Sequence, residues 1–246
     1  MPSDTSRPEE PRQEAFGYTC ALCLRCCYHK HIQLNPYEVA RLARQVGVST
    51  TVFRAEFTQE GAGKALSQTE TGACVFLGPE GCIVHPNRPL VCRLYPLGRE
   101  VSNNGEESYV HLTPHPQSEG TLSKAGTIAR YLEEQGAAPF IQAADAYFYW
   151  HCRAIGQLQA LKTDPEADAS DAEVATASAF RLLDMDVAIA GYCKDHGIAP
   201  PDDIETRHAL HIQILDRHLM ISASEGIADV HPAHVHADRD VQVEPR

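Results

Sequence analysis

The sequence lacks the features that several large protein classes require. No uninterrupted apolar run approaches the roughly 20 residues of a membrane-spanning helix, and the opening stretch "MPSDTSRPEEPRQE" has no apolar segment typical of a secretory signal. Neither a G-x-G-x-x-G nor a P-loop motif occurs, and no nucleophile elbow is present. We therefore expect a cytoplasmic protein without a membrane partner, and we predict neither a dinucleotide-binding fold, nor an ATPase, nor a nucleophilic hydrolase.

Positive charge is also scarce. The 246 residues include 21 Lys and Arg against 33 Asp and Glu, which gives a formal net charge of -12. Non-specific nucleic-acid binding relies on clustered cations that neutralise phosphates. The composition therefore argues against a nucleic-acid partner, and we expect an unidentified small molecule or another protein instead.

Cysteine, by contrast, is abundant and unevenly placed. Seven of the nine cysteines fall within the first 92 residues, and four of these lie in the stretch "CALCLRCC". A reducing cytosol disfavours disulfides, so clustered cysteines indicate metal binding or redox chemistry. A C-x2-C spacing lets two thiolates reach one metal, and the two overlapping copies here are similar to the run that holds a cubane cluster. The predicted metal ligands are Cys20, Cys23, Cys26, Cys27, Cys74, Cys82 and Cys92.

The adjacent residues Cys26 and Cys27 leave the number of metal centres open. Neighbouring side chains diverge, so at most one of the two is expected to complete a local triad with Cys20 and Cys23. Cys27 either serves a second centre with the distant cysteines or packs inward as a small apolar residue. Tandem spacing favours an iron–sulfur cluster of the [4Fe-4S] type, with zinc as the alternative.

Several cations lie within or beside the cysteine segments of this otherwise acidic chain. Four thiolates around a zinc ion or a cubane leave net negative charge that needs nearby donors or cations. We predict Arg88 and Arg93 as cofactor-binding residues that supply part of this balance. Arg25, Lys30 and Arg99 are further candidates.

The pattern along the chain predicts a mainly α protein of the α+β class. Residues 1–15 are typical of disorder, and residues 16–118 form the predicted cysteine-cluster module. Residues 119–223 form a predicted helical lobe of about four helices, and residues 224–246 a flexible tail that contains histidines.

Local signals place individual elements. Asn35 and Glu38 form a capping box for a helix that ends at Gly47, and a shorter helix carrying Phe53 and Phe57 should follow. An Asn-Gly pair between "LGREV" and "SYVHL" predicts a hairpin. The predicted helices of the lobe cover 121–135, 139–162, 171–195 and 203–222, the third opening with a capping box from Ser170 to Glu173.

The remaining chemically active side chains favour structural roles. His85 follows Cys82 at C-x2-H spacing, but enough cysteines exist for us to expect it beside the metal rather than on it. Glu205, His208 and His211 share one helix face, and without a second Glu-x-x-His we expect a polar face instead of a di-iron site. We expect the aromatic run 147–150 in the core, and Cys152 and Cys193 as buried apolar residues.

The segments "CALCLRCCYHKHIQLNPYEVARLA" and "CVFLGPEGCIVHPNRPLVCRLYP" together resemble the CxxCxxCC zinc- or iron-chelating family, the YkgJ-type cysteine cluster proteins. The resemblance spans about residues 17 to 97. By position, the seven cysteines match the cysteines of the family, and Arg88, Pro89, Arg93 and Pro96 match its companion residues. One branch resembles flagellin lysine methylases, which implies a cluster with S-adenosylmethionine, although no motif here supports that cofactor or a lysine N-methylase-like activity.

The chain also departs from the family pattern. Members often carry one more cysteine after this block, where the present sequence reads "HLTPHPQSEG". Either that ligand is missing, or His111 or His115 replaces it. Two functions therefore stay open: a cluster protein that supports group-transfer or redox chemistry, and a non-catalytic structural-zinc module with a helical lobe for protein interaction.

Overall fold

The computed structural model describes residues 11–59, 64–102, 104–163 and 181–224. Its α-helices are α1 (Pro36–Val46), α2 (Thr50–Glu56), α3 (Leu90–Leu94), α4 (Ile128–Glu134), α5 (Ala138–Thr163), α7 (Met185–His196) and α8 (Ile204–Ser224). Short 3-10 helices are η1 (Pro11–Gln13), η2 (Arg25–Cys27) and η3 (His85–Asn87). The strands are β1 (Ala15–Thr19), β2 (Gln33–Leu34), β3 (Thr58–Gln59), β4 (Lys64–Leu66), β5 (Leu77–Gly78), β6 (Gly81–Cys82), β7 (Leu97–Val101), β8 (Glu107–His111) and β9 (Thr121–Thr127). This content confirms the predicted mainly α, α+β class.

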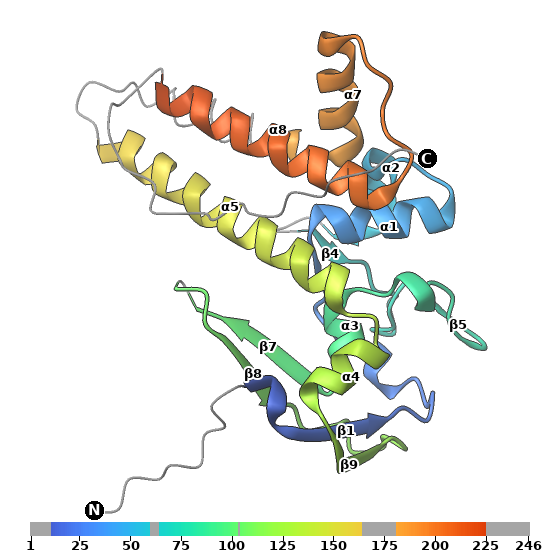
Figure 1. Ribbon diagram of the computed structural model, residues 1–246. Helices are drawn as coiled ribbons and strands as arrows, with labels where there is room; N and C mark the ends of the chain where they lie inside the picture. The colour runs from blue at the N-terminus through green and yellow to red at the C-terminus, as the bar shows by residue number, and fades with distance from the viewer. Residues whose placement is uncertain (1–10, 60–63, 103, 164–180, 225–246) are drawn as a thin grey trace, which may run out of the picture.

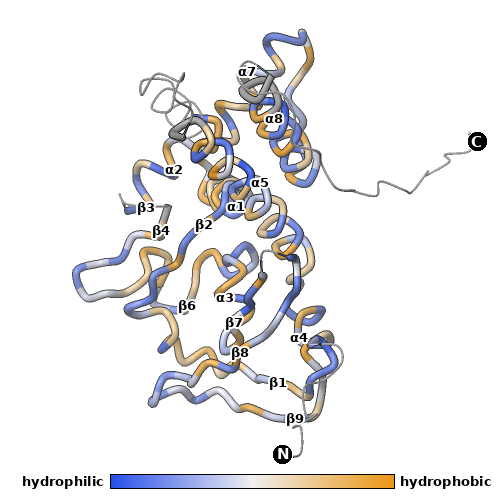
Figure 2. The backbone as a smooth tube through the Cα atoms, turned by 90° about the vertical axis from the view of Figure 1, so that its left-hand side faces the viewer, coloured by the Kyte–Doolittle hydropathy of each residue, from blue (hydrophilic) through white to orange (hydrophobic). Residues whose placement is uncertain are grey.

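The strands form four small antiparallel sheets instead of one large sheet. Their orders are β1-β9, β2-β4-β3, β5-β6 and β7-β8. The long helices α5, α7 and α8 gather at one end of the molecule, and the β1-β9 ribbon lies at the other (Figure 1). A side view places α3 and β6 between these two ends (Figure 2).

The largest core cluster joins both halves of the chain. Trp150 of α5 and Leu215 of α8 pack in the same cluster as Phe16 of β1, Tyr37 of α1 and Leu97 of β7. The predicted boundary at residue 118 therefore does not separate two independent cores, and the division into a module and a lobe stays a prediction. No helix among the described residues is long and apolar enough to cross a membrane.

Helix α1 begins as its sequence predicts. The Asn35 side chain accepts a hydrogen bond from the backbone N–H of Glu38 at 3.0 Å, and the Glu38 carboxylate accepts one from the N–H of Asn35 at 3.0 Å. Pro36 occupies the first turn, and Gly47 ends the helix with a φ of 78°, a conformation that glycine adopts without steric cost. The capping box is confirmed, and so is the short helix carrying Phe53, with Phe57 as its C-cap.

The predicted hairpin is confirmed as β7 and β8, paired from Leu97 opposite His111 to Val101 opposite Glu107. The Arg99 guanidinium donates to both carboxylate oxygens of Asp145 in α5, at 2.7 and 2.9 Å. It also donates to Glu107 in the partner strand. This bidentate ion pair ties the hairpin to the long helices.

The predicted helix over 121–135 is wrong in its first half. Residues Thr121–Thr127 form strand β9, and only Ile128–Glu134 are helical. The strand pairs with β1, with Tyr18 opposite Leu122. A pairing partner about 100 residues earlier thus overrides a weak local helix preference, and the Thr127 hydroxyl then caps α4 by accepting the N–H of Arg130 at 3.3 Å.

The other predicted helices of the lobe correspond to α5, α7 and α8. The third, predicted as one helix over 171–195, is interrupted: a turn at Leu183 and Asp184 follows helical residues 181 and 182, and α7 begins at Met185 with Asp184 as its N-cap. The predicted capping box from Ser170 to Glu173 lies outside the described residues. Residues 1–10 and the predicted tail from residue 225 onward also lie outside, whereas η1 and β1 occupy residues 11–13 and 15–19.

Candidate metal centre

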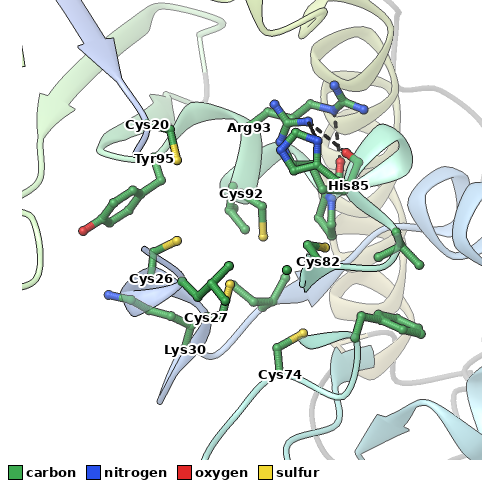
Figure 3. Close-up of a pocket in the computed structure, with 18 of the residues that line it drawn as sticks. Cys20, Cys26, Cys27, Lys30, Cys74, Cys82, His85, Cys92, Arg93 and Tyr95 are labelled. Atoms are coloured by element: carbon green, nitrogen blue, oxygen red, sulfur yellow. Dashed lines mark hydrogen bonds between the residues drawn. The ribbon is translucent and has the colours of Figure 1, made fainter. Parts of the chain in front are cut away.

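All seven predicted cysteine ligands line a single cavity of about 490 Å³. Four of them come from the loop that links β1 to β2, two from the segment around β5 and β6, and one from α3 (Figure 3). Residues up to 72 positions apart in the sequence are therefore brought to one place. The structure gives the predicted set a common location, and the role of these thiols as metal ligands stays a prediction.

The loop that carries the first four cysteines is held open to solvent. No residue between Thr19 and Pro36 is buried. Leu22, Leu24 and His29 have positive φ values of 54°, 63° and 53°, which non-glycine residues rarely adopt and which cost of order 1–3 kcal/mol each. The four cysteines of this loop all line the cavity.

Backbone N–H groups are directed at four of the sulfurs. The N–H of Leu22 donates to Cys20 Sγ at 3.4 Å. In the same relation of residue i+2 to cysteine i, the N–H groups of Arg25, Phe76 and Val84 point at Cys23, Cys74 and Cys82. Donors of this kind stabilise thiolates and recur around metal-bound cysteines.

These hydrogen bonds and burial act on the thiol pKa values in opposite directions. The N–H of Glu119, followed by that of Arg25, lowers the pKa of Cys23. Burial outweighs the corresponding bonds at Cys74 and Cys82, so the pKa of each is raised. A metal at this site would have to supply the charge that deprotonates the two inner thiols.

The cysteine doublet behaves as a coupled pair. The Cys27 thiol is directed at Cys26 Sγ, and this hydrogen bond raises the pKa of Cys27 and lowers that of Cys26. Cys92 borders the cavity and so keeps an accessible surface, yet protein atoms surround it closely enough that desolvation raises its pKa. Within the described residues, the thiols border the cavity without converging, and no three His, Cys, Asp or Glu side chains stand in a metal-binding arrangement.

The Arg93 side chain donates its hydrogen bonds mainly to backbone carbonyl oxygens. Its guanidinium is buried and donates to the carbonyl oxygens of Pro86, Arg88 and Gln135, and it stacks 3.9 Å from the ring centroid of Phe140. Burial lowers its pKa to about 10, so it stays a cation at neutral pH. Arg93 thus joins the wall of the cavity to the end of α4.

Arg88 makes a parallel link. It donates to the His85 carbonyl at 2.8 Å and to the Gln135 side chain at 2.7 Å. Arg88 and Arg93 both line the cavity, and the Arg88 charge acts favourably on the Cys82 thiolate. The predicted role of the two arginines in balancing the charge of a cofactor stays a prediction.

The histidines separate into two groups. His85 lines the cavity, 3.3 Å from Arg88, and burial lowers its pKa. His111 instead lies 2.8 Å from Glu14 and packs edge-on against Phe16, and His115 lies in a turn, where its backbone N–H donates to Tyr95. Neither His111 nor His115 belongs to the described lining of the cavity. The structure therefore gives no support to the replacement of a missing cysteine by either.

Sequence reasoning missed the aromatic side of the cavity. Tyr18, Tyr95 and Tyr131 line it, and the Lys30 ammonium lies 5.7 Å from the ring centroid of Tyr95. Tyr95 could have been noticed, because it falls within the "RLYP" end of the cysteine block. Tyr18 and Tyr131 carried no such signal, since the β1-β9 pairing and α4 bring them to the cavity from distant parts of the chain.

Two members of the polar face expected on α8 lie inside the molecule. His208 and His211 are buried, and Tyr147 makes a 2.8 Å hydrogen bond with His211 Nδ1. This part of the face packs against α5. The His211 Nε2 also has a hydrogen-bond partner, the Leu182 carbonyl at 2.6 Å.

The two isolated cysteines differ in burial. Cys193 is buried as predicted, whereas Cys152 is exposed. Tyr147, Trp150 and Ala154 form the buried stripe of α5, and Cys152 follows Trp150 by two residues, about 200° further around the helix.

Comparison with known families supports the resemblance. Residues 19–112 match the family model described as "CxxCxxCC: Putative zinc- or iron-chelating domain". The matched segment contains all seven cysteines that line the cavity, so the recognition of this domain from the sequence is confirmed. No curated protein matches the chain, and no solved structure does.

Proposed function

We propose that the cavity of this zinc- or iron-chelating cysteine domain holds a thiolate-bound metal centre, and that the centre is an iron–sulfur cluster of the [4Fe-4S] type. One observation carries the proposal: seven cysteines from three separate segments line the same cavity. The chemistry of the donors fits, because thiolates select zinc and iron–sulfur clusters over harder metals. The proposed ligands come from Cys20, Cys23, Cys26, Cys27, Cys74, Cys82 and Cys92.

The protein around the sulfurs also suits an anionic thiolate centre. Four of the thiols receive backbone N–H groups, and the charges of Lys30 and Arg88 act favourably on Cys26 and Cys82. Such donors and cations stabilise the bound thiolate form and set the redox properties of a cluster. Arg93 links the segment before α3 to the end of α4 through its hydrogen bonds to the Arg88 and Gln135 carbonyls.

The cavity has room for a ligand beside the metal. Its volume of about 490 Å³ lies within the range of about 300–1,000 Å³ that is typical of small-molecule sites. Tyr18, Tyr95 and Tyr131 give it an aromatic wall, to which a small molecule can bind without displacing the thiols. A bound cluster supplies electron transfer or an electrophilic site, so we propose group-transfer or redox chemistry on a small molecule.

A structural-zinc module is the second candidate, and one observation favours it. The cysteine loop contains no buried residue, so apolar packing contributes little to its order. A closed zinc site would stabilise such a loop directly, as it does in small zinc modules. The helical lobe would then bind a protein partner.

Anaerobic purification of the full chain separates the two candidates. Iron, acid-labile sulfide and a broad visible absorption that bleaches on reduction are the expected result for the cluster. A colourless protein with stoichiometric zinc would replace the cluster by the structural site, and a protein without bound metal would overturn both. Cys152→Ser, which removes an exposed thiol on α5, is the matched control and should leave the metal content unchanged.

A further inference from the structure

The charge of the cavity wall is opposite to that of the chain. Acidic residues outnumber basic ones by 33 to 21 in the sequence. Among the described residues that line the cavity, Lys30, Arg88 and Arg93 are cations, whereas Glu80 is the only carboxylate. A cleft lined mainly by one sign of charge attracts ligands of the other sign. The wall therefore favours an anion.

These three cations also lack carboxylate partners. Arg99 and Arg207, which like Arg88 are partly shielded from solvent, each pair with at least one carboxylate. No ion pair to a cation of the cavity wall occurs among the described residues. A shielded charge without a partner costs free energy, so an anion that reaches it can bind favourably.

Arg93 is already engaged by the protein. Its Nε, Nη1 and Nη2 donate to the backbone carbonyls of Arg88, Gln135 and Pro86. Because Arg93 bonds to the main chain of both Arg88 and Gln135, it fixes the relative position of these two residues. Arg93 is thus a positioning residue and leaves the ligand to its neighbour.

Arg88 is the guanidinium that stays available. Its Nη1 donates to the His85 carbonyl at 2.8 Å and its Nη2 to the Gln135 Oε1 at 2.7 Å. These bonds hold the side chain in place, and its Nε–H has no partner among the described residues. A guanidinium held in one geometry can bind a carboxylate through charge-assisted hydrogen bonds with little further loss of rotamer freedom.

The wall near Arg88 is aromatic and apolar. The Arg88 charge acts on Tyr131, whose hydroxyl already donates to the Tyr95 carbonyl at 2.8 Å. Figure 3 shows Tyr95 on one side of Cys92 and His85 on the other. The aliphatic and phenyl side chains of the lining include Leu24, Ile32, Leu66, Phe76, Val84 and Leu112. Such a wall suits a ligand whose body is apolar.

We infer that the cavity binds a small carboxylate with an apolar or aromatic body, and that Arg88 binds the carboxylate group while the tyrosine wall packs against the body. This inference rests on the proposed function and deepens it, because it names the class of small molecule on which the centre acts. A phosphate fits less well. Phosphate sites combine several donors, whereas here Arg93 is engaged and the Lys30 ammonium lies over the Tyr95 ring.

The competing role for Arg88 is to balance the thiolates of the centre alone, since its charge also acts on Cys82. Matched probes separate the two roles in the anaerobically purified full chain. Phenylacetate and hexanoate carry a carboxylate on an aromatic and an aliphatic body, and phenylacetamide and hexanamide are their neutral counterparts. Isothermal titration calorimetry should show that at least one carboxylate binds about tenfold or more tightly than its amide, because the amide loses the charge-assisted bonds. Inorganic phosphate, which lacks the apolar body, should compete weakly.

Two substitutions assign this preference to Arg88. Arg88→Gln removes the guanidinium, and Gln135→Glu places a carboxylate of the same size against it, where it competes with the ligand. Each should remove the preference for the carboxylate. Arg153→Gln, which removes an exposed arginine that pairs with Asp216, is the matched control and should keep it. Helical circular dichroism and metal content are measured for every variant.

Equal binding within both pairs of probes would overturn the inference. A preference that survives Arg88→Gln or Gln135→Glu, or phosphate that competes as strongly as phenylacetate, would also overturn it. The failure of the proposed function is a separate result. A protein without metal that keeps the preference refutes the metal centre and not the carboxylate site, whereas a metal-loaded protein without the preference refutes only the carboxylate site.

Discussion

The cysteine loop and the helix pair α5–α8 are held in opposite ways. Between Thr19 and Pro36 no side chain is buried, whereas α5 and α8 meet through Tyr147, Trp150 and Leu215, all of them buried in the largest core cluster. Apolar burial contributes about 25 cal/mol per Å², so the helix pair gains its order from surface removed from water. The loop removes much less, since only its end, with the half-buried Ile32 and Leu34, packs against a core cluster.

The loop must therefore be ordered by other contacts. A few backbone hydrogen bonds attach it, including the one from His29 to the Gly72 carbonyl at 2.8 Å and the one from Cys74 to Cys27. It also carries three positive φ values, which cost free energy. Apolar burial thus stabilises the helix pair, whereas we expect bound metal to be the main source of order in the loop.

Removal of the metal should have the largest effect, and it should act on the loop and not on the helix pair. After anaerobic chelation, we expect backbone amides in residues 20–34 to lose hydrogen-exchange protection by at least about 100-fold, because structural metal sites contribute more than the corresponding ~2.7 kcal/mol. Peptides from α5 and α8 should keep their protection. Mass-spectrometric hydrogen exchange measures both regions in one sample, and equal loss in the two would mean that they unfold as one unit.

The reciprocal change affects the helices. Trp150→Ala should lower the free energy of unfolding by about 3–5 kcal/mol, because it empties a site where the side chain is only 2% exposed. Urea unfolding followed by circular dichroism measures the loss, and metal content in the folded variant should stay at the wild-type level.

Trp150→Phe is the matched control for that substitution. It keeps most of the ring and removes the Trp150 Nε1, a buried donor that has no partner among the described residues, so its loss should be smaller. Equal losses for the two variants would show that the tryptophan does not support the core through its volume.

The effect of acidification through His211, on the helices, should be the smallest of the three. Burial lowers the pKa of His211 to about 4 from an ordinary value near 6.5. The unfolded chain therefore binds this proton first, and the stabilisation from neutral His211, complete above pH 6.5, is lost as the pH falls toward 4. Glu38, whose pKa burial raises to about 7, has the opposite sign and favours the folded state as the pH falls through the same range.

Comparison with His211→Gln isolates the histidine, because the contributions of Glu38 and of metal loss are common to both proteins. Between pH 7 and pH 5, the wild type should lose about 2 kcal/mol more unfolding free energy than the variant, from about 1.5 pH units at 1.36 kcal/mol each. Parallel pH profiles of the two proteins would refute this role of His211.

The sequence predicts those elements whose signals are local. The capping box at Asn35 and Glu38 and the hairpin after Leu97 are each specified within about 15 residues, and both are confirmed. The strand Thr121–Thr127 was predicted as helix because its partner, β1, lies about 100 residues away. Local propensity cannot contain that information.

The site shows the same limit. Cysteine spacing and the block around Cys92 predicted which residues share a cavity, since these residue types rarely cluster without a metal. The sequence did not reveal that Arg93 donates hydrogen bonds to three backbone carbonyls, or that Tyr18 and Tyr131 line the cavity. Those roles depend on which backbone comes near, and only the assembled fold determines this.

The pairing of β1 with β9 also sets an order of events during protein synthesis. Cys20 directly follows β1, yet its strand partner leaves the ribosome about 100 residues later, roughly 5–20 s at about 5–20 residues per second. Through that interval the first four thiols of the nascent chain have neither the distant cysteines nor the ribbon that aims them at the cavity. Assembly of the complete proposed centre would therefore follow translation of residue 127, and until then these thiols would be open to oxidants and to competing metals.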